Sequence, residues 1–379
     1  MSNQSIGDDV PDAEDPATTP GGPAHRLLGL ILEGGWHVTS MRSAQPDDTG
    51  AYFSVGYFAD QVDAQESPTG ARAFVKALDY SKWEELNLRT SADAIQALTS
   101  AFLFERDIVE ACTGRHMANV VRGIDSGSVV VPGFAQPFAT VNYIVFEVAD
   151  GGDVRAQLRS LDAFDEAWKL RVLHNVANGL RQLHQADFAH QDLKPSNVLC
   201  FGEIANGGSA KVGDLGRAHN PLSPGPHANA QVPGDAKYAP PELLYRQFEP
   251  DERLRCRAID AYHLGSLITC LFCALGTTAG ILSRLAPEFH FSVWTEDYSS
   301  VLPYVREAYD DHLDEVATYL PQHDTDKLMA LIRELTDPDP AVRGNPKSGH
   351  HYTRFAMERY VSILNRLARD AEIRLKNNV

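Results

Sequence analysis

The sequence predicts an α+β fold made of two lobes, the first rich in β-strands and the second helical. Between residues 25 and 147, short runs of β-branched and aromatic residues alternate with polar stretches, which is typical of strands joined by loops. After residue 154, apolar residues recur at the three-to-four-residue spacing of buried helix faces. Glycines punctuate residues 147–152, between the two patterns, and we place the join there.

Composition limits what the protein can be. With 379 residues, of which 43% are hydrophobic, the chain can bury a large core in one two-lobed domain or in two domains. Its formal net charge of -17 predicts an acidic surface, which argues against nucleic acid or an anionic membrane as the main partner. No run of about 18 uninterrupted apolar residues occurs, so we predict no membrane span. Five cysteines, an odd and sparse set, favour a reducing compartment, so we expect a cytoplasmic location.

Residues 1–24 are predicted to be a disordered acidic tail. Aspartate, glutamate and proline are frequent in this stretch, as is typical of disordered segments. It lacks both the basic region and the apolar core of a signal peptide. We therefore expect the folded part of the chain to begin near residue 25.

The first lobe, residues 25–147, is predicted to hold strands and one helix. The helix runs from about Ala92 to Cys112. The predicted strands, which are rich in aromatic and β-branched residues, are 52–58, 73–78 and 143–146. The polar stretches predicted to be loops are 42–50, 60–70 and 80–92.

The second lobe, residues 148–349, is predicted to be helical. Leu173, Val176, Leu180 and Leu183 step by three, four and three residues, which marks one buried helix face. Further helical patterns lie around 258–275, 304–319, 325–336 and 351–376. The last of these belongs to a C-terminal region, 350–379. Its apolar positions, which either pack on the helical lobe or bind a partner, are Phe355, Ile363, Leu364 and Leu367.

The segment from residue 190 to residue 197 carries most of the chemistry. It places a carboxylate (Asp192), a cation (Lys194) and a carboxamide (Asn197) within six residues. Asp192 can orient an incoming hydroxyl or accept its proton, and Lys194 can neutralise charge on a transferred phosphoryl group. Asn197 and the later Asp214 offer the oxygen ligands that Mg²⁺ prefers. The set predicts phosphoryl transfer.

These residues resemble the protein kinase family, whose catalytic loop reads His-Arg-Asp-Leu-x-x-x-Asn and whose metal loop reads Asp-Phe-Gly. Lys194-Pro195 resembles the serine/threonine branch of that family. The resemblance covers roughly residues 28–346. It implies a two-lobed protein-kinase-like fold, with the N-lobe at 25–147 and the C-lobe at 148–349. Other matching positions are 238–242, Asp260 with Gly265, and Arg343.

Lys76 resembles the family's third-strand lysine, which grips the nucleotide phosphates. Such a lysine needs a carboxylate to hold it. Phe102, Glu105, Val109 and Cys112 step by three, four and three residues, so Glu105 lies on an inward helix face. A buried carboxylate must be paired because its desolvation is otherwise too costly. We therefore expect an ion pair between Lys76 and Glu105.

The resemblance also implies a nucleotide pocket. Phe146 stands at the gatekeeper position, and the backbone of Glu147 and Ala149 resembles the hinge that contacts adenine. Asp153 is expected to bond the ribose hydroxyls, and Leu199 to form the floor of the adenine pocket. For the loop that covers the phosphates, the family pattern Gly-x-Gly-x-x-Gly is poorly matched. The candidates are Gly50, which is equally well explained as an ordinary hairpin turn, and the alternative 33–35.

Two departures from the family pattern carry information of their own. Gln191 replaces the arginine that receives an activation-loop phosphate in many kinases, and residues 217–233 contain a single hydroxyl residue, Ser223. We therefore expect activity that does not depend on activation-loop phosphorylation. Asp235 stands where a threonine is usual, so it either turns away, pairs with Lys194 or changes the substrate pocket. Glu242 and Arg343 are expected to form a structural ion pair, and Asp260 to hold the catalytic loop.

The sequence therefore predicts an ATP- and Mg²⁺-dependent protein serine/threonine kinase that acts on a protein substrate. The alternative is a nucleotide-binding pseudokinase that serves as a regulatory or scaffold module. The poor glycine loop, Gln191 and Asp235 favour the pseudokinase, whereas the intact set of Lys76, Asp192, Asn197 and Asp214 favours an active enzyme. Phosphorylation of a small molecule is disfavoured by the downstream motifs at 238–242.

Overall fold

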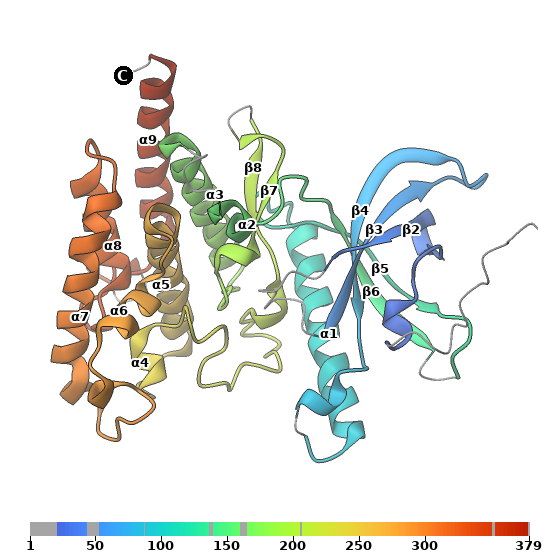
Figure 1. Cartoon of the computed structure of the whole chain (residues 1–379), viewed down its shortest axis with the longest axis horizontal. Coiled ribbons are helices and arrows are strands. Elements are labelled where there is room, and N and C mark those ends of the chain that lie inside the picture. The colour runs from blue at the N-terminus through green and yellow to red at the C-terminus, as the bar shows by residue number, and fades with distance from the viewer. Residues whose placement is uncertain are drawn as a thin grey trace, which may run out of the picture.

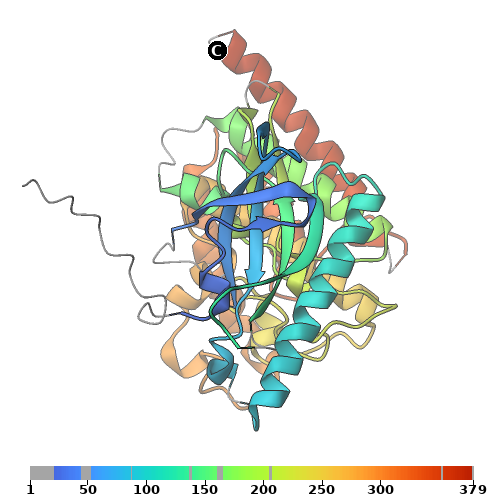
Figure 2. The ribbon, with the colours of Figure 1, turned by 90° about the vertical axis from the view of Figure 1, so that its right-hand side faces the viewer.

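A computed structural model describes residues 21–43, 53–86, 88–135, 139–159, 165–204, 207–350 and 353–377. Across these residues the chain forms a β-rich N-lobe and a helical C-lobe, which lie side by side in Figure 1. The fold is the α+β, two-lobed arrangement that the sequence predicts. Figure 2 views the molecule from the N-lobe side, with the sheet in front and helix α1 (Ser91–Gly114) beside it.

The N-lobe is built on one antiparallel sheet with the strand order β1-β2-β3-β4-β6-β5. The strands are β1 (Ile31–Leu32), β2 (Trp36–Met41), β3 (Ser54–Val62), β4 (Pro68–Leu78), β5 (Gly123–Val130) and β6 (Thr140–Glu147). Three short 3₁₀ helices belong to the same lobe: η1 (Pro23–His25), η2 (Glu33–Gly35) and η3 (Trp83–Leu86).

The alternation of side chains along β3 and β4 decides what faces the C-lobe. Val75 and Ala77 point into the N-lobe core together with Tyr57. The intervening residues Phe74 and Lys76 therefore point to the other face, because successive side chains of a strand alternate. The register pairs Lys76 with Gly56 and Phe74 with Phe58. This face becomes the roof of the cavity between the lobes.

The N-lobe holds more strand than the sequence predicts. Residues 60–70, predicted to be a loop, extend β3 and β4 outward and turn only at 63–67, where the Asp63 side chain accepts two backbone N–H groups. That prediction was wrong because the outer parts of these strands are exposed and polar, so they lack an apolar face. Strands β1, β2 and β5 were not predicted at all.

The predicted N-terminal tail ends earlier than residue 24. Residues 1–20 lie outside the described residues, but Ala24 is buried and its carbonyl accepts the Tyr57 hydroxyl at 2.7 Å. His25 contacts Asp79 at 3.0 Å. Pro23 supplies the first residue of η1, a position where proline's missing N–H costs nothing. The residues just before 25 are therefore part of the N-lobe.

The C-lobe contains eight helices among its described residues and a two-stranded sheet. The helices are α2 (Val154–Leu158), α3 (Glu166–Gln185), α4 (Pro241–Leu244), α5 (Glu252–Cys273), α6 (Thr277–Arg284), α7 (Tyr298–Tyr319), α8 (Thr325–Thr336) and α9 (Met357–Lys376). The strands are β7 (Val198–Phe201) and β8 (Ser209–Val212). The 3₁₀ helices are η5 (Pro195–Asn197), η7 (Leu215–Arg217) and η8 (Pro287–Phe289).

The core of the C-lobe forms around α3 and α5. The predicted apolar face of α3 is fully buried, and α5 is apolar nearly all round because it packs against α3, α7 and α8. Helix α5 begins six residues before the predicted start, where the Asp251 side chain caps it by accepting the N–H of Leu254. Helix α7 begins at Tyr298 rather than 304, with Pro303 inside its first turns. Helix α9 starts later than predicted, at Met357.

Helix α9 packs along α3, as Figure 1 shows. Leu364 and Leu367 are fully buried in this contact, and Phe355 is buried just before the helix. Two ion pairs also hold α9 in place. Arg171 of α3 contacts Glu372 of α9 at 2.7 Å, and Arg374 of α9 contacts Asp324, just before α8, at 2.7 Å. Of the two roles expected for this region, the structure shows packing on the helical lobe.

Among the described residues, no single helix has the length and apolar character needed to cross a membrane. Helices α5 and α6 meet these criteria only as a pair bent by 76°.

Candidate active site

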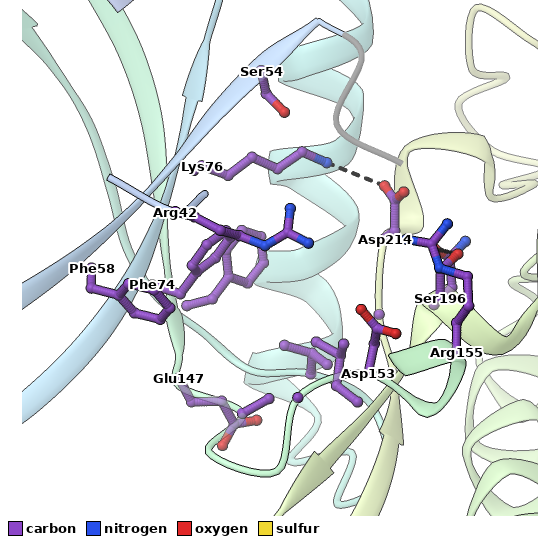
Figure 3. A pocket seen from close by; sticks show the side chains of 18 of the residues that line it. Arg42, Ser54, Phe58, Phe74, Lys76, Glu147, Asp153, Arg155, Ser196 and Asp214 are labelled. Atoms are coloured by element: carbon purple, nitrogen blue, oxygen red, sulfur yellow. Dashed lines mark hydrogen bonds and ion pairs between the residues drawn. The ribbon is translucent and has the colours of Figure 1, made fainter. Parts of the chain in front are cut away.

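A cavity of about 250 Å³ lies between the lobes, and Figure 3 shows the side chains around it. Strands β3 and β4 cover it from the N-lobe, while β7 and the segment around Asn197 line it from the C-lobe. The sequence-predicted residues that line the cavity are Lys76, Glu105, Phe146, Glu147, Ala149, Asp153, Asn197, Leu199 and Asp214.

Lys76 forms the central ion pairs of the site. Its Nζ lies 2.7 and 2.9 Å from the two carboxylate oxygens of Glu105 and 3.2 Å from Oδ1 of Asp214. Glu105 is buried on the inner face of α1, as its helical spacing predicts, and Lys76 is its expected partner. Burial raises the pKa of Asp214, but Lys76 outweighs it and holds that pKa below its ordinary value. The pairs join the N-lobe sheet, α1 and the C-lobe.

Asp192, Lys194 and Asn197 lie together below this ion pair. Lys194 Nζ is 3.1 Å from Asp192 Oδ2, and the Asn197 amide donates to the Asp192 carbonyl at 2.8 Å and to its Oδ2 at 3.3 Å. The pKa of Asp192 is raised chiefly by burial, although Lys194 acts against the shift. Lys194 and Asn197 are themselves buried, and η5 fixes the turn between them.

Asp260 holds the backbone of this loop from below. Its fully buried carboxylate accepts the N–H groups of His190 and Gln191, each at 2.8 Å, and contacts His184 at 2.8 Å. These bonds outweigh burial and lower the pKa of Asp260. The His190 ring in turn contacts the carbonyl of Gly213 at 2.9 Å, next to Asp214. The two halves of the site are therefore held in fixed relation by a hydrogen-bonded network.

The oxygen donors fit a hard divalent cation. Asn197 uses its amide nitrogen on Asp192, so its amide oxygen remains as an acceptor, with a 3.5 Å contact from the Ser196 hydroxyl. Asp214 supplies a carboxylate that lines the same cavity. Carboxylate and amide oxygens are suitable ligands for Mg²⁺. These two residues are the ones that would hold the metal.

The hinge residues are engaged by neighbouring elements. The Glu147 carboxylate contacts Lys211 of β8 at 2.7 Å and accepts the N–H of Arg122 at 2.7 Å, so this side chain is committed to structure. The Glu147 N–H is engaged as well, because it donates to the carbonyl of Arg122 at 3.1 Å. A contact of this backbone with adenine stays a prediction. Asp153 caps α2 by accepting the N–H of Ala156 at 2.8 Å through Oδ1.

The candidate loop for covering the phosphates is only partly described. Gly50 lies outside the described residues, but Arg42 and Ser54, which flank that stretch, both line the cavity. The alternative loop at 33–35 was wrong. It forms η2 before β2, where the Glu33 N–H donates to Tyr143, far along the strand from Arg42.

Sequence reasoning missed two aromatic residues of the cavity. Phe74 and Phe58 form an edge-to-face pair with ring centroids 5.8 Å apart, and both line the roof. A Cβ on Gly56 would lie 2.8 Å from the tip of the Phe74 ring, so glycine at this position leaves room for the ring where it lies. The signal was available, because Phe74 lies two residues from Lys76 in one strand and must share its face. Arg42 and Arg155 were missed as well, since they lie outside regular motifs.

Glu242 and Arg343 form the expected buried ion pair. The two terminal guanidinium nitrogens, Nη1 and Nη2, each lie 2.7 Å from one carboxylate oxygen, and the guanidinium also lies 4.9 Å from the Tyr262 ring centroid. Asp235 pairs with Lys194, at 3.6 Å, which is one of the three arrangements that the sequence left open. Among the described residues, no cluster of three or more histidine, cysteine, aspartate or glutamate side chains forms a separate metal site.

Comparisons with known proteins agree with this geometry. A model of the protein kinase domain matches residues 69–348. Similar curated proteins include the human serine/threonine-protein kinase H2 (31% identical over 147 residues, covering 38% of this chain and 36% of that protein). The probable cyclin-dependent kinase 8 of Dictyostelium discoideum is 32% identical over 142 residues (36% and 34%), and the Aurora/IPL1-related protein kinase 2 of Caenorhabditis briggsae 29% over 126 residues (33% and 37%). The chain spans about a third of the length of these relatives.

Proposed function

This chain belongs to the protein kinase domain family, and from that premise we propose that it transfers the γ-phosphoryl group of ATP to serine or threonine hydroxyls of protein substrates. The names of relatives such as the human serine/threonine-protein kinase H2 support this class of acceptor. The observation that carries the proposal is the contact of Lys76 with both Glu105 and Asp214. It sets a phosphate-binding cation and a metal-binding carboxylate side by side in the cavity.

The chain's own residues account for the transfer by positioning and charge. Bound ATP supplies the phosphoryl group, and Mg²⁺ neutralises charge that develops on it. Lys76 binds phosphate oxygens from the N-lobe side, and Asn197 and Asp214 would hold the metal. Asp192 orients the acceptor hydroxyl. The acceptor oxygen then forms the new bond to phosphorus, the bond to the β–γ bridging oxygen breaks, and the hydroxyl proton passes toward Asp192. Lys194 balances charge on the moving group.

The environment of Asp192 supports its assignment. Burial raises the pKa of this carboxyl above its ordinary value, which improves its capacity to take up a proton. The Asn197 amide and Lys194 fix its orientation from two sides. A carboxylate held in this way can bind a hydroxyl in one geometry without reorganising during the transfer.

The test compares the wild-type protein with Asp192→Asn. Both are incubated with labelled ATP and Mg²⁺ and a generic protein substrate, phosphorylated residues are mapped by mass spectrometry, and nucleotide affinity is measured by calorimetry. We expect Asp192→Asn to lower the transfer rate about 10²- to 10⁴-fold while nucleotide affinity changes little. Asp311→Asn, on the exposed side of α7, is the matched control and should transfer at the wild-type rate.

One outcome would favour the alternative function. If the wild-type protein binds nucleotide but transfers no phosphoryl group to itself or to any substrate, the chain is a nucleotide-binding pseudokinase. The observation that favours the pseudokinase is that Lys194 lies within reach of two carboxylates, Asp192 and Asp235.

We also propose that activity does not depend on phosphorylation of the segment 217–233. Gln191, which stands where the family has a phosphate-binding arginine, is buried and donates to the carbonyl of Cys256 at 2.8 Å. Its φ of 65° is unusual for a residue other than glycine, and the hydrogen bond that its N–H donates to Asp260 fixes that conformation. The position is thus committed to internal contacts, which supports a segment held without a phosphate.

A further inference from the structure

Asp235 adds a carboxylate to the acceptor side of the site. A second cavity, of about 370 Å³, adjoins the nucleotide cavity and shares Lys76, Glu105 and Asp214 with it. The charged side chains that line this second cavity are four carboxylates, Glu105, Asp192, Asp214 and Asp235, and three cations, Lys76, Lys194 and Arg217. Asp192 and Asp235 lie at its C-lobe end, where an acceptor hydroxyl must approach.

The position of Asp235 is fixed by its backbone as well as its side chain. Its N–H donates to Asp192 Oδ1 at 2.7 Å, and its own Oδ1 accepts the N–H of Lys237 at 3.0 Å. The preceding Gly234 packs so closely that an added Cβ would lie 2.6 Å from Asp192 Oδ1 and 3.0 Å from Asp192 Cα. The carboxylate of Asp235 is therefore held beside Asp192.

Lys194 is the cation that faces Asp235, and the proposed function also requires it to balance charge on the phosphoryl group. Its Nζ lies 3.6 Å from Asp235 and 3.1 Å from Asp192. In the proposed function, on which this inference rests, Lys194 turns to the phosphoryl group. Asp235 then has no lysine partner among the described residues, although its side chain is only 18% exposed. Arg217 does not replace it, because its guanidinium donates to His227 at 2.8 Å and to the carbonyl of Pro233.

A partly buried carboxylate next to a phosphoryl group is unfavourable unless a cation pairs with it. We propose that the substrate supplies this cation: Asp235 binds an arginine or lysine side chain that lies next to the serine or threonine receiving the phosphoryl group. Asp235 therefore selects protein acceptors by charge. The chain's net charge of -17 favours the approach of such basic segments.

The experiment uses three peptides that share one serine and differ only in the flanking residue, which is arginine, glutamine or glutamate. The value of kcat/KM is measured for each with ATP and Mg²⁺. We expect wild-type protein to prefer the arginine peptide over the glutamine peptide about tenfold, and to use the glutamate peptide least, because the carboxylate attracts the first and repels the last.

Two substitutions assign this preference to Asp235. Asp235→Asn removes the charge and should bring the arginine-to-glutamine ratio close to one, whereas Asp235→Glu keeps the charge and should retain the preference. Asp311→Asn, which removes an exposed carboxylate on α7, should leave the ratio unchanged. If Asp235→Asn does not fold, the arginine-to-glutamine ratios of the wild-type protein and of Asp235→Glu still test the proposal.

The proposal is overturned if wild-type protein transfers phosphate equally to all three peptides, or if Asp235→Asn keeps the full preference. Either result leaves the kinase activity itself standing. A protein that binds nucleotide but modifies none of the peptides, nor any generic substrate, contradicts the proposed function instead.

Discussion

His312 on α7 is a buried imidazole whose two ring nitrogens have no hydrogen-bond partner among the described residues. It fills a gap left by Gly280 on α6, where an added Cβ would lie 2.4 Å from the ring. Burial, helped by the charge of Arg284, lowers the pKa of His312 to about 4. The ring is therefore neutral in the folded protein and serves as a polar filler between two helices.

We predict that His312→Met makes the protein more resistant to acid. The pKa of His312 in the folded protein lies below its unfolded value of about 6.5, so unfolding takes up a proton when the pH falls below that value. Through His312 the protein therefore loses about 2–3 kcal/mol of its free energy of unfolding between pH 7 and pH 4. Methionine does not titrate and adapts to irregular space. When the free energy of unfolding is measured with urea at pH 7 and at pH 5, its decrease between the two pH values should be smaller for the variant than for the wild-type protein.

The control for this measurement is His323→Met, at an exposed position, which should follow the wild-type pH dependence. If the free energy of unfolding of His312→Met decreases in acid as much as that of the wild-type protein, other histidines cause most of the decrease. His227 and His263, whose pKa values are also lowered to about 4, mainly by burial, would then be the next to substitute.

At the level of elements, the segment between η7 and α4 is held by its own contacts. Arg217 donates to His227 at 2.8 Å, and the Gln231 amide donates to the carbonyl of Leu243 at 3.0 Å. Ser223, the single hydroxyl residue in 217–233, is exposed. These contacts tie both ends of the segment without a phosphate, which is the physical basis for expecting independence from modification.

We predict that Ser223→Ala retains at least about half of the wild-type transfer rate, since substitutions at exposed positions away from special contacts usually change little. Initial rates with labelled ATP should be compared for protein purified with and without phosphatase treatment. Asp192→Asn serves as the inactive reference. Loss of most activity in Ser223→Ala, together with phosphate mapped to Ser223 in the wild-type protein, would contradict the proposal.

Long elements with a clear apolar period were predicted well from the sequence, whereas short strands were predicted poorly. Helix α3 and the inward position of Glu105 follow from spacing, because apolar periodicity fixes which face is buried, whereas Lys76 was assigned as its partner from the resemblance to the kinase family. Strand β5, by contrast, contains two glycines and two serines, and β2 ends in an exposed half. Such strands are specified by their partners in the sheet, so their own residues carry little signal.

Across the whole molecule, α9 is part of the folded domain and no appendage. Its apolar face covers α3, the helix that leads into the segment 190–197, and its charged residues pair with α3 and with the turn before α8. The sequence left open whether this helix packs or binds a partner, since an amphipathic pattern does not name the surface that covers it. That answer needed the three-dimensional structure.

We predict that Leu364→Ala lowers the free energy of unfolding by about 2–5 kcal/mol, because it leaves a cavity in the α3–α9 contact. Leu375→Ala, in the same helix but 52% exposed, should change it by less than about 0.5 kcal/mol. Both are measured by urea denaturation. Equal effects of the two substitutions, or a separate early transition for α9, would show that the helix is not part of the cooperative unit.

The fit of Phe74 against Gly56 constrains how this sequence can drift over evolutionary time. A side chain gained at residue 56 would meet the tip of the aromatic ring across the strand pair at 2.8 Å, so a mutation there forces the ring to move unless residue 74 has first become small. The two positions are thus epistatic, and the order of substitutions matters. Lineages descending from this chain should therefore keep Gly56 for as long as residue 74 remains phenylalanine.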